Sequence, residues 1–270
     1  MARLCKNEFT DELRILFDAN PLRIPQRRMK PLTILEIDST RKARYFTEFK
    51  SLIDGDFGNP VKIRTEELAG FSMKKSKKVK VGLGLDLLNG YLGAFGVPPA
   101  AIEGEIQKDD KFSLSFSNVS RNYFDQFELG RFLEKNEIRI NEKFLAMKSP
   151  DSKLAIIIDS IVSKDFNISV YDKSDHGVNL ELPAIKELIG NVKTEVSQSK
   201  ETSNEISFKK NYPLTFAFSC KEIQIIDGKI VAGELIQNAR GIGPDMIKQN
   251  LLDDDMDQGA LLIDISSDNV

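Results

Sequence analysis

Cys5 is the residue whose neighbours most favour a covalent modification. It lies between Arg3 and Lys6, just before residues 9–17, where apolar side chains recur at the spacing of a short amphipathic helix. A thiol beside basic residues, next to a helix that suits a membrane surface, is typical of an S-acylation site. Cys5 is therefore a candidate for a covalent fatty acyl group such as palmitoyl, and no other cofactor is expected. The alternative is an ordinary reduced cysteine on the surface.

The other reactive residue types do not combine into a catalytic site. The 270 residues include one histidine and no tryptophan. A single histidine leaves almost no possibility of a histidine metal site or a Ser/His/Asp triad. His176 lies in a turn-like segment and is expected to be exposed, whereas Cys220 alternates into an apolar strand as a core residue does. Two cysteines far apart in the sequence are typical of a reducing, cytoplasmic protein. We predict that the protein is not an enzyme.

Two short motifs carry little weight. Gly82-x-Gly84 follows a strand-like stretch, but Leu87 stands where the third glycine of a dinucleotide-binding motif would be. The run 253–255 consists of three aspartates that could hold a divalent ion, yet no EF-hand spacing surrounds it, and such runs commonly face solvent. We therefore expect neither a metal site nor a nucleic-acid partner.

Charge is distributed unevenly along the chain. Residues 241–270 contain one basic residue, Lys248, and seven acidic ones, a net charge of −6, while residues 1–240 contain 37 basic and 34 acidic residues. The junction at 239–244 has two glycines and a proline, which interrupt regular structure. We predict a body, residues 1–240, and a C-terminal tail, residues 241–270. The tail is either a solvated terminus or a segment that docks on the body. Docking is favoured by its large apolar residues, which include Met246, Ile247, Leu251, Leu252, Leu261, Leu262, Ile263 and Ile265.

Alternating apolar residues predict an α+β fold, a twisted antiparallel central sheet with surrounding helices. Residues 193–205 contain almost no large apolar residues and are expected to form a mobile surface hairpin. The expected strands are 22–24, 32–37, 79–85, 112–116, 154–161, 166–171, 192–196, 214–218 and 223–226, and the expected helices are 87–95 and 182–189.

Three segments resemble gasdermins, a family of pore-forming proteins. Residues 206–225, with the core strand Leu214-Thr215-Phe216-Ala217-Phe218, resemble the stretch that closes the gasdermin pore-forming domain. Residues 137–146 look like the strand that precedes the family's second inserting hairpin. The opening, from Cys5 to residues 31–35, is similar to the start of bacterial gasdermins, which carry a lipidated cysteine near the start and a short inhibitory tail.

The resemblance implies an autoinhibited precursor of a membrane pore. A caspase-like or trypsin-like protease would remove the tail, and the released body would oligomerise into a large β-barrel pore in the inner membrane. The expected outcome is cell death in defence against phage. The protein would be a cytoplasmic monomer at rest and a lipid-bound homo-oligomer after cleavage.

Insertion would have to use strands. The longest uncharged stretch, Leu87 to Ile102, contains glycines and two prolines and falls short of a spanning helix. A strand of a closed barrel needs only about 9 to 11 residues of alternating character. Four strands cannot enclose a wide channel, so many copies must assemble. The predicted first hairpin uses Val79, Val81, Leu83, Leu85, Phe112, Leu114 and Phe116, and the second uses Phe166, Ile168, Val170, Val192 and Val196.

The remaining predicted site residues are those expected to contact lipid headgroups or the activating protease. Basic side chains near anionic headgroups contribute about 1 kcal/mol each, and two clusters fit this role. The cut is expected between Arg240 and Asp255, where Arg240, Lys248 and Leu251 are candidates for the residue on its N-terminal side. The basic clusters are Arg27 with Arg28, and Lys74, Lys75, Lys77, Lys78 and Lys80.

A different class of function also fits the charge pattern. A soluble, non-enzymatic binding module could use its acidic tail to engage a partner protein. That hypothesis predicts that loss of the tail brings no gain of membrane activity.

Overall fold

The structure is a computed structural model of the whole chain. It describes residues 19–39, 43–58, 60–68, 79–98, 111–172, 174, 176–178, 186–187, 194–198, 204–231 and 265–266.

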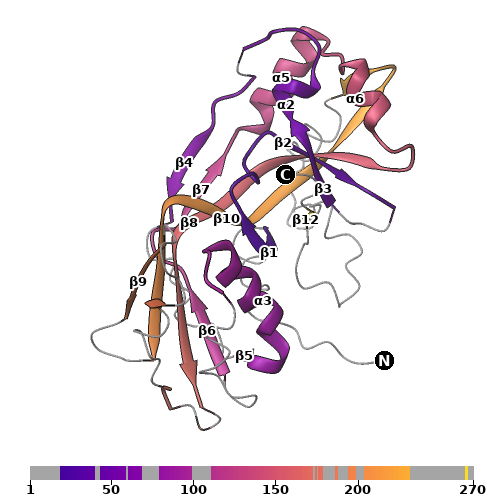
Figure 1. Cartoon of the computed structure of the whole chain (residues 1–270). Helices are drawn as coiled ribbons and strands as arrows, with labels where there is room; N and C mark the ends of the chain where they lie inside the picture. Colours follow the sequence, from indigo (N-terminus) through magenta and orange to yellow (C-terminus); the bar gives the residue numbers. More distant parts are fainter. Residues whose placement is uncertain are drawn as a thin grey trace, which may run out of the picture.

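Two long antiparallel strands form the centre of the sheet and run along the length of the molecule (Figure 1). They are β8 (Lys153–Tyr171) and β10 (Glu205–Ile226), of 19 and 22 residues. The main path of the sheet is β1-β10-β8-β2-β3-β12, while β9 and β11 pair with β10, β6 and β7 pair with β8, and β4 and β5 extend the sheet beyond β7 and β6. Within the described ranges the other strands are β1 (Asn20–Gln26), β2 (Thr33–Ile37), β3 (Ala43–Glu48), β4 (Arg64–Glu67), β5 (Val79–Lys80), β6 (Lys111–Ser115), β7 (Ser120–Tyr123), β9 (Thr194–Gln198), β11 (Lys229–Val231) and β12 (Ile265–Ser266).

This arrangement confirms the predicted α+β class and its antiparallel centre. Two details differ. The strands predicted at 154–161 and 166–171 are one continuous strand, β8, and 214–218 and 223–226 are both parts of β10. A hairpin follows between β10 and β11, which turns at Asp227 and Gly228 with φ of 51° and 74°. Positive φ at both loop residues is the Asp-Gly hairpin turn, a signal present in the sequence.

Helices pack on the sheet at both of its ends (Figure 1). At one end α2 (Phe49–Leu52) and α5 (Gln126–Asn136) pack on Ile156 and Ile158 of β8, with α6 (Glu142–Met147) beside them. Farther along, α3 (Val81–Ala94) packs on the face that carries Ile161. The molecule therefore has different cores at its two ends.

The core beneath α3 is rich in aromatic residues. The rings of Phe116 and Phe216 stack with centroids 4.3 Å apart, and Phe166 lies 5.5 Å from both Phe208 and Tyr91. Offset aromatic pairs of this kind add about 0.5 to 1.5 kcal/mol each beyond the area that they bury. They bind α3 to the sheet through side chains from distant parts of the chain.

A charged pair lies between the two ends, on the middle of β8. Arg121 Nε donates to Asp159 Oδ2 at 2.6 Å, and Asp159 is 3% exposed. Its other oxygen, Oδ1, meets no hydrogen-bond donor from the described part of the chain. Burial raises the pKa of Asp159, and the Arg121 guanidinium opposes that rise only in part. The carboxylate is therefore costly to keep charged.

We predict different costs for replacing the two partners. A carboxyl with a raised pKa in the folded state contributes most to stability below its unfolded pKa, and that contribution falls as the pH rises through its folded pKa. Asp159→Asn removes the buried charge and should change the free energy of unfolding at pH 7 by less than about 1 kcal/mol in either direction. Arg121→Met leaves the charge unpaired and should cost about 3 kcal/mol. Urea unfolding of both variants at pH 7 and pH 5 measures the difference. Equal losses in the two variants would contradict this account.

Candidate functional site

The tail returns to the body as the last strand of the sheet. β12 lies beside β3 and pairs with it in parallel, with Ile265 opposite Ala43 and Ser266 opposite Arg44 (Figure 1). On its other side β3 pairs with β2, so β12 occupies the outer edge of β3. An edge strand presents unpaired N–H and C=O groups to which another chain can add. The tail thus covers part of an open sheet edge.

A buried carboxylate fixes the strand on which β12 docks. Glu36 of β2 is 2% exposed and accepts hydrogen bonds from Arg44 Nε at 2.7 Å, from Ser149 N at 2.8 Å and from Ser152 Oγ at 2.5 Å. Burial by itself would raise the pKa of Glu36, but Ser152, Ser149 and the Arg44 guanidinium outweigh it and lower the pKa below its ordinary value. Arg44 is also the residue opposite Ser266. Glu36 therefore links β3, the strand that pairs with β12, to the loop before β8.

The first predicted hairpin has a different structure from the one expected. Val79 lies in the short β5, opposite Phe112, but the chain then turns into α3 at Val81. The prediction of a strand to residue 85 was therefore wrong for Val81, Leu83 and Leu85, which belong to a helix. The predicted helix at 87–95 is its C-terminal part, so the helix begins six residues earlier than the sequence indicated.

Helix α3 is intrinsically weak. Its 14 residues include the glycines 82, 84, 90 and 93. Each glycine in a helix interior costs about 1 kcal/mol relative to alanine. The alternating apolar residues 81, 83, 85 and 87 have the period of a strand. Tertiary contacts with the sheet therefore decide the helical form of a segment whose local pattern also suits a strand.

The other predicted inserting residues lie in the core of this state. Phe112 and Leu114 are on β6, and they pair in register with Val170 and Ile168 of β8. All four are 2% exposed or less, as are Phe116 and Phe166. Val196 is on β9 opposite Phe208, so β9 and the start of β10 form a hairpin over residues 194–210. The predicted second hairpin, which joined 166–171 with 192–196, is not formed in this state, because β8 and β9 both pair with β10. Val192 lies outside the described residues. Residues predicted to face lipid are thus core residues here, covered by α3.

The predicted headgroup-contacting residues are only partly described. Arg27 and Arg28 follow β1 and are exposed, with their guanidinium groups 5.1 Å from the Tyr212 ring and 5.7 Å from the Tyr45 ring. Lys80 is in β5, at the register position opposite Lys111. The remaining predicted residues lie outside the described ranges; they are Cys5, Lys74, Lys75, Lys77, Lys78, Arg240, Lys248 and Leu251.

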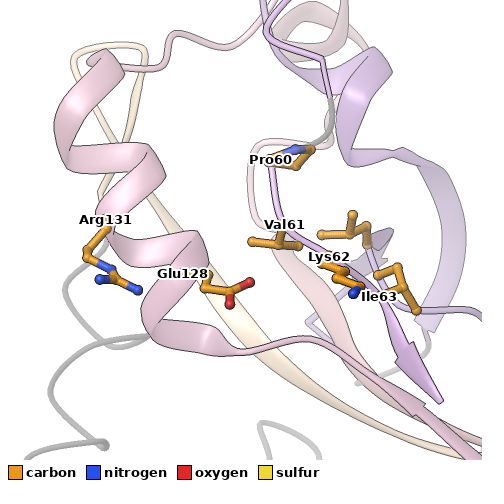
Figure 2. Close-up of a pocket in the computed structure, with 7 residues that line it drawn as sticks. Pro60, Val61, Lys62, Ile63, Glu128 and Arg131 are labelled. Atoms are coloured by element: carbon orange, nitrogen blue, oxygen red, sulfur yellow. The ribbon is translucent and has the colours of Figure 1, made fainter.

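An open cavity of about 700 Å³ lies between α5 and the segment before β4 (Figure 2). Glu128 and Arg131 of α5 face Val61, Lys62 and Ile63 across it. The Glu128 carboxylate is already paired with Arg64 at 2.6 Å. No nucleophile stands beside a base among the lining residues, so the cavity offers a surface of mixed charge rather than a catalytic centre.

The isolated reactive residues occupy the expected kinds of position. The side chain of His176 is 81% exposed, with Nδ1 3.6 Å from a carboxylate oxygen of Asp172. Cys220 is buried in the core, as its alternating context predicted. Within the described ranges, no three histidine, cysteine or acidic side chains come together as potential metal ligands. No helix in those ranges combines the length and apolar character needed to cross a bilayer.

Comparison with known proteins identifies the family. The model of the bacterial gasdermin family matches residues 22–234, which is most of the chain. The chain belongs to the bacterial gasdermin family. It therefore belongs to a family of pore-forming proteins, as the three resembling segments of the sequence indicated.

Individual relatives agree with this assignment. A gasdermin from a Vitiosangium species is 25% identical over 213 residues, 78% of this chain and 79% of the relative. A gasdermin from a Desulfuromonadales bacterium is 26% identical over 232 residues, 85% of this chain and 86% of that protein. The solved structure of a bacterial gasdermin from Bradyrhizobium tropiciagri has the same fold. It matches with a TM-score of 0.63 at 19% identity and covers 85% of this chain and 92% of its own.

We predict that the Glu36 network stabilises this gasdermin in a pH-dependent way. A carboxyl whose pKa is lowered in the folded state contributes stability above its unfolded pKa, and this stability is lost as the pH falls through the folded pKa. Glu36→Gln should therefore lower the free energy of unfolding at pH 7 by about 1 to 3 kcal/mol. The difference in the free energy of unfolding between Glu36→Gln and the native chain should shrink as the pH is lowered towards 4. Denaturant unfolding at several pH values measures it.

Glu48→Gln is the matched control, because Glu48 forms an exposed pair with Lys30 at 2.7 Å. Its effect should stay below about 1 kcal/mol. A loss in Glu36→Gln that is the same at every pH would contradict the assigned role of the charge.

Proposed function

We propose that this gasdermin is the autoinhibited precursor of a membrane pore, activated when a protease removes its C-terminal tail. The observation that carries the proposal is the pairing of β12 with the outer edge of β3. That pairing places the far end of the tail, residues 241–270, on a strand edge that a neighbouring copy could otherwise use. The body, residues 1–240, would be free to assemble only after the tail has left.

The proposed trigger is loss of the covalent tether. The body is described as far as Val231, the end of β11, and the tail pairs with β3 at Ile265 and Ser266. As long as the chain is intact, tethering keeps a weakly bound strand at a high effective concentration. A caspase-like or trypsin-like protease that cuts after Arg240, Lys248 or Leu251 would abolish that advantage. The cut itself would not alter the pairing of β12 with β3, but the untethered strand would then dissociate.

In the proposed insertion step, two regions become barrel strands. Residues 79–87 would extend β5 at the expense of the glycine-rich α3 and pair with β6. The C-terminal end of β8, together with β9, would supply the second hairpin. The apolar residues now packed beneath α3, such as Phe112 and Ile168, would turn to lipid. Many copies would close one β-barrel, because an open sheet edge in hydrocarbon leaves costly unpaired backbone groups.

The membrane contacts follow from charge and acylation. Arg27, Arg28 and the lysines at 74–80 would approach anionic headgroups of the inner membrane, each contributing about 1 kcal/mol. A palmitoyl chain on Cys5 would add up to about 0.8 kcal/mol for each buried methylene. The protein would be a cytoplasmic monomer before cleavage and a homo-oligomer afterwards. The resulting leak would kill the cell and so restrict phage.

Tail removal should convert the chain from inactive to membrane-permeabilising. A chain that ends at Leu251 lacks β12 and should release dye from vesicles of phosphatidylethanolamine and phosphatidylglycerol, whereas the full chain should not. Equal inactivity of both chains would overturn the proposal. It would favour the binding-module hypothesis if the tail still captured a partner protein.

The contribution of β12 can be isolated in the uncut chain. The double variant Ile265→Pro/Ser266→Pro removes two backbone donors from β12 and should leak dye at a rate between those of the full and truncated chains. The conservative pair Ile265→Val/Ser266→Thr keeps β-forming residues at both positions and should remain inactive. Leakage by the conservative pair would show that side chains, rather than backbone pairing, hold the tail.

Acylation of Cys5 is tested independently by mass. The intact mass of the purified full chain should exceed the mass of its sequence by one palmitoyl group. That increment should be absent in Cys5→Ala. A native chain with no increment would refute the lipid on Cys5 and leave the role of the tail untouched.

A further inference from the structure

The C-terminal end of α3 is closed in two different ways. Gly96, with φ of 76°, follows the helix in the left-handed conformation. Val97 N donates to Leu92 O at 2.8 Å, and Gly96 N donates to Gly93 O at 2.9 Å. This pair of hydrogen bonds is the Schellman motif, a common helix ending that glycine favours. It satisfies two of the last carbonyls of the helix and leaves those of Ala94 and Phe95 to find other partners.

Those two carbonyls are capped by side chains from the β9–β10 hairpin. Lys210 Nζ donates to Ala94 O at 2.6 Å, and Thr194 Oγ1 donates to Phe95 O in a very short hydrogen bond. Lys210 and Thr194 stand directly opposite each other in the register of β9 and β10. One cross-strand pair therefore holds two successive carbonyls at the end of the helix.

The ammonium group of Lys210 is placed for this role. It also donates to the Tyr212 hydroxyl at 3.0 Å and lies 5.9 Å from the Phe95 ring. Among the described residues it has no carboxylate partner. A cation at a helix C-terminus interacts favourably with the helix dipole. The positive charge is thus directed at the end of α3 and not at an acidic residue.

The position of these contacts matters because α3 is weak by itself. A short helix with four glycines depends on its surroundings for stability. Its aromatic contacts hold the middle of the helix, while Lys210 and Thr194 hold its end. The hairpin that supplies both residues is part of the second region proposed to insert.

We propose that Lys210 and Thr194 form a latch that couples the release of α3 to the release of the β9–β10 hairpin. The coupling rests on the proposed function, in which both regions become barrel strands. When α3 unwinds from its C-terminal end, the hairpin loses its contact with the helix. When the hairpin moves, the helix loses the caps on Ala94 O and Phe95 O. The latch makes the two regions leave the resting state together.

Hydrogen exchange on the full, uncut chain tests the latch without reference to pores. The amides of Phe95, Gly96 and Val97 are hydrogen-bonded at the helix end and report its opening. Lys210→Met should speed their exchange on the order of tenfold, the expected effect of losing one hydrogen bond to a charged group. The Leu32 amide, which donates to Ile157 O at the other end of the sheet, should keep its protection and show that the variant is folded.

Lys209→Met is the matched control. Lys209 is the neighbouring residue on β10, is exposed, and points to the other face of the strand. Its replacement removes the same charge and should leave exchange at residues 95–97 unchanged. Equal exchange in Lys209→Met and Lys210→Met would overturn the latch, whether or not the chain forms pores.

Coupling is tested by the second half of the latch. Thr194→Val should also speed exchange at residues 95–97, and Lys210→Met should speed exchange of the β9–β10 amides around Ser197 and Ser207, which pair in register. In chains ending at Leu251, Lys210→Met should release dye on the order of tenfold faster than Lys209→Met. Faster exchange confined to α3, with β9–β10 unaffected, would overturn the coupling. If the native truncated chain does not leak, the proposed function fails while the exchange result still decides whether the latch exists.

Discussion

The antiparallel ladder between β8 and β10 is the constraint on which the rest of the molecule depends. Every other strand is attached to one of these two, directly or through one or two intervening strands. The register of the ladder shifts at three places, and the largest shift is where residues 210–213 of β10 face only Lys164 of β8. Polar residues gather near this bulge: Ser163 Oγ donates to Ser117 O at 2.7 Å, and Asn118 Nδ2 donates to Asp165 Oδ2 at 2.6 Å. The two parts meet elsewhere on β8: α2 and α5 cover the part around Ile156, and α3 covers the part from Ile161 onward, on both sides of this bulge.

This division gives the two parts different freedom to rearrange. The part near α5 has apolar clusters on both faces of the sheet, and Glu36 ties its strands to the loop before β8. The part beneath α3 has its main cluster on one face, closed by a helix with four glycines. Elements with weak intrinsic preference are the ones that open most easily. In the proposed mechanism, the α3 end of the sheet is rebuilt while the α5 end stays folded.

The sequence predicted the fold class, most strands and the burial of Cys220, because those follow from local alternation of apolar residues. It failed at α3, where the period-2 pattern of residues 81–87 indicated a strand. The helix is decided by contacts from Phe166, Thr194 and Lys210, far away in the chain, which no local pattern can show. The edge pairing of β12 was likewise out of reach, since two residues are too few to leave a pattern. Asp227-Gly228 is different: its turn signal was present in the sequence.

The structure also changes the interpretation of the tail. Its acidic composition suggested attraction to a basic body, yet its described contact is backbone pairing over two residues. A few hydrogen bonds at about 0.5 to 1.5 kcal/mol each give a dissociation constant well above the millimolar range for a free peptide. A short tether supplies millimolar effective concentration, and hence some occupancy of the β3 edge that a free peptide would lack. It follows that a cut after Arg240, Lys248 or Leu251 would have the same result, because each separates β12 from the body and none needs to disturb the pairing itself.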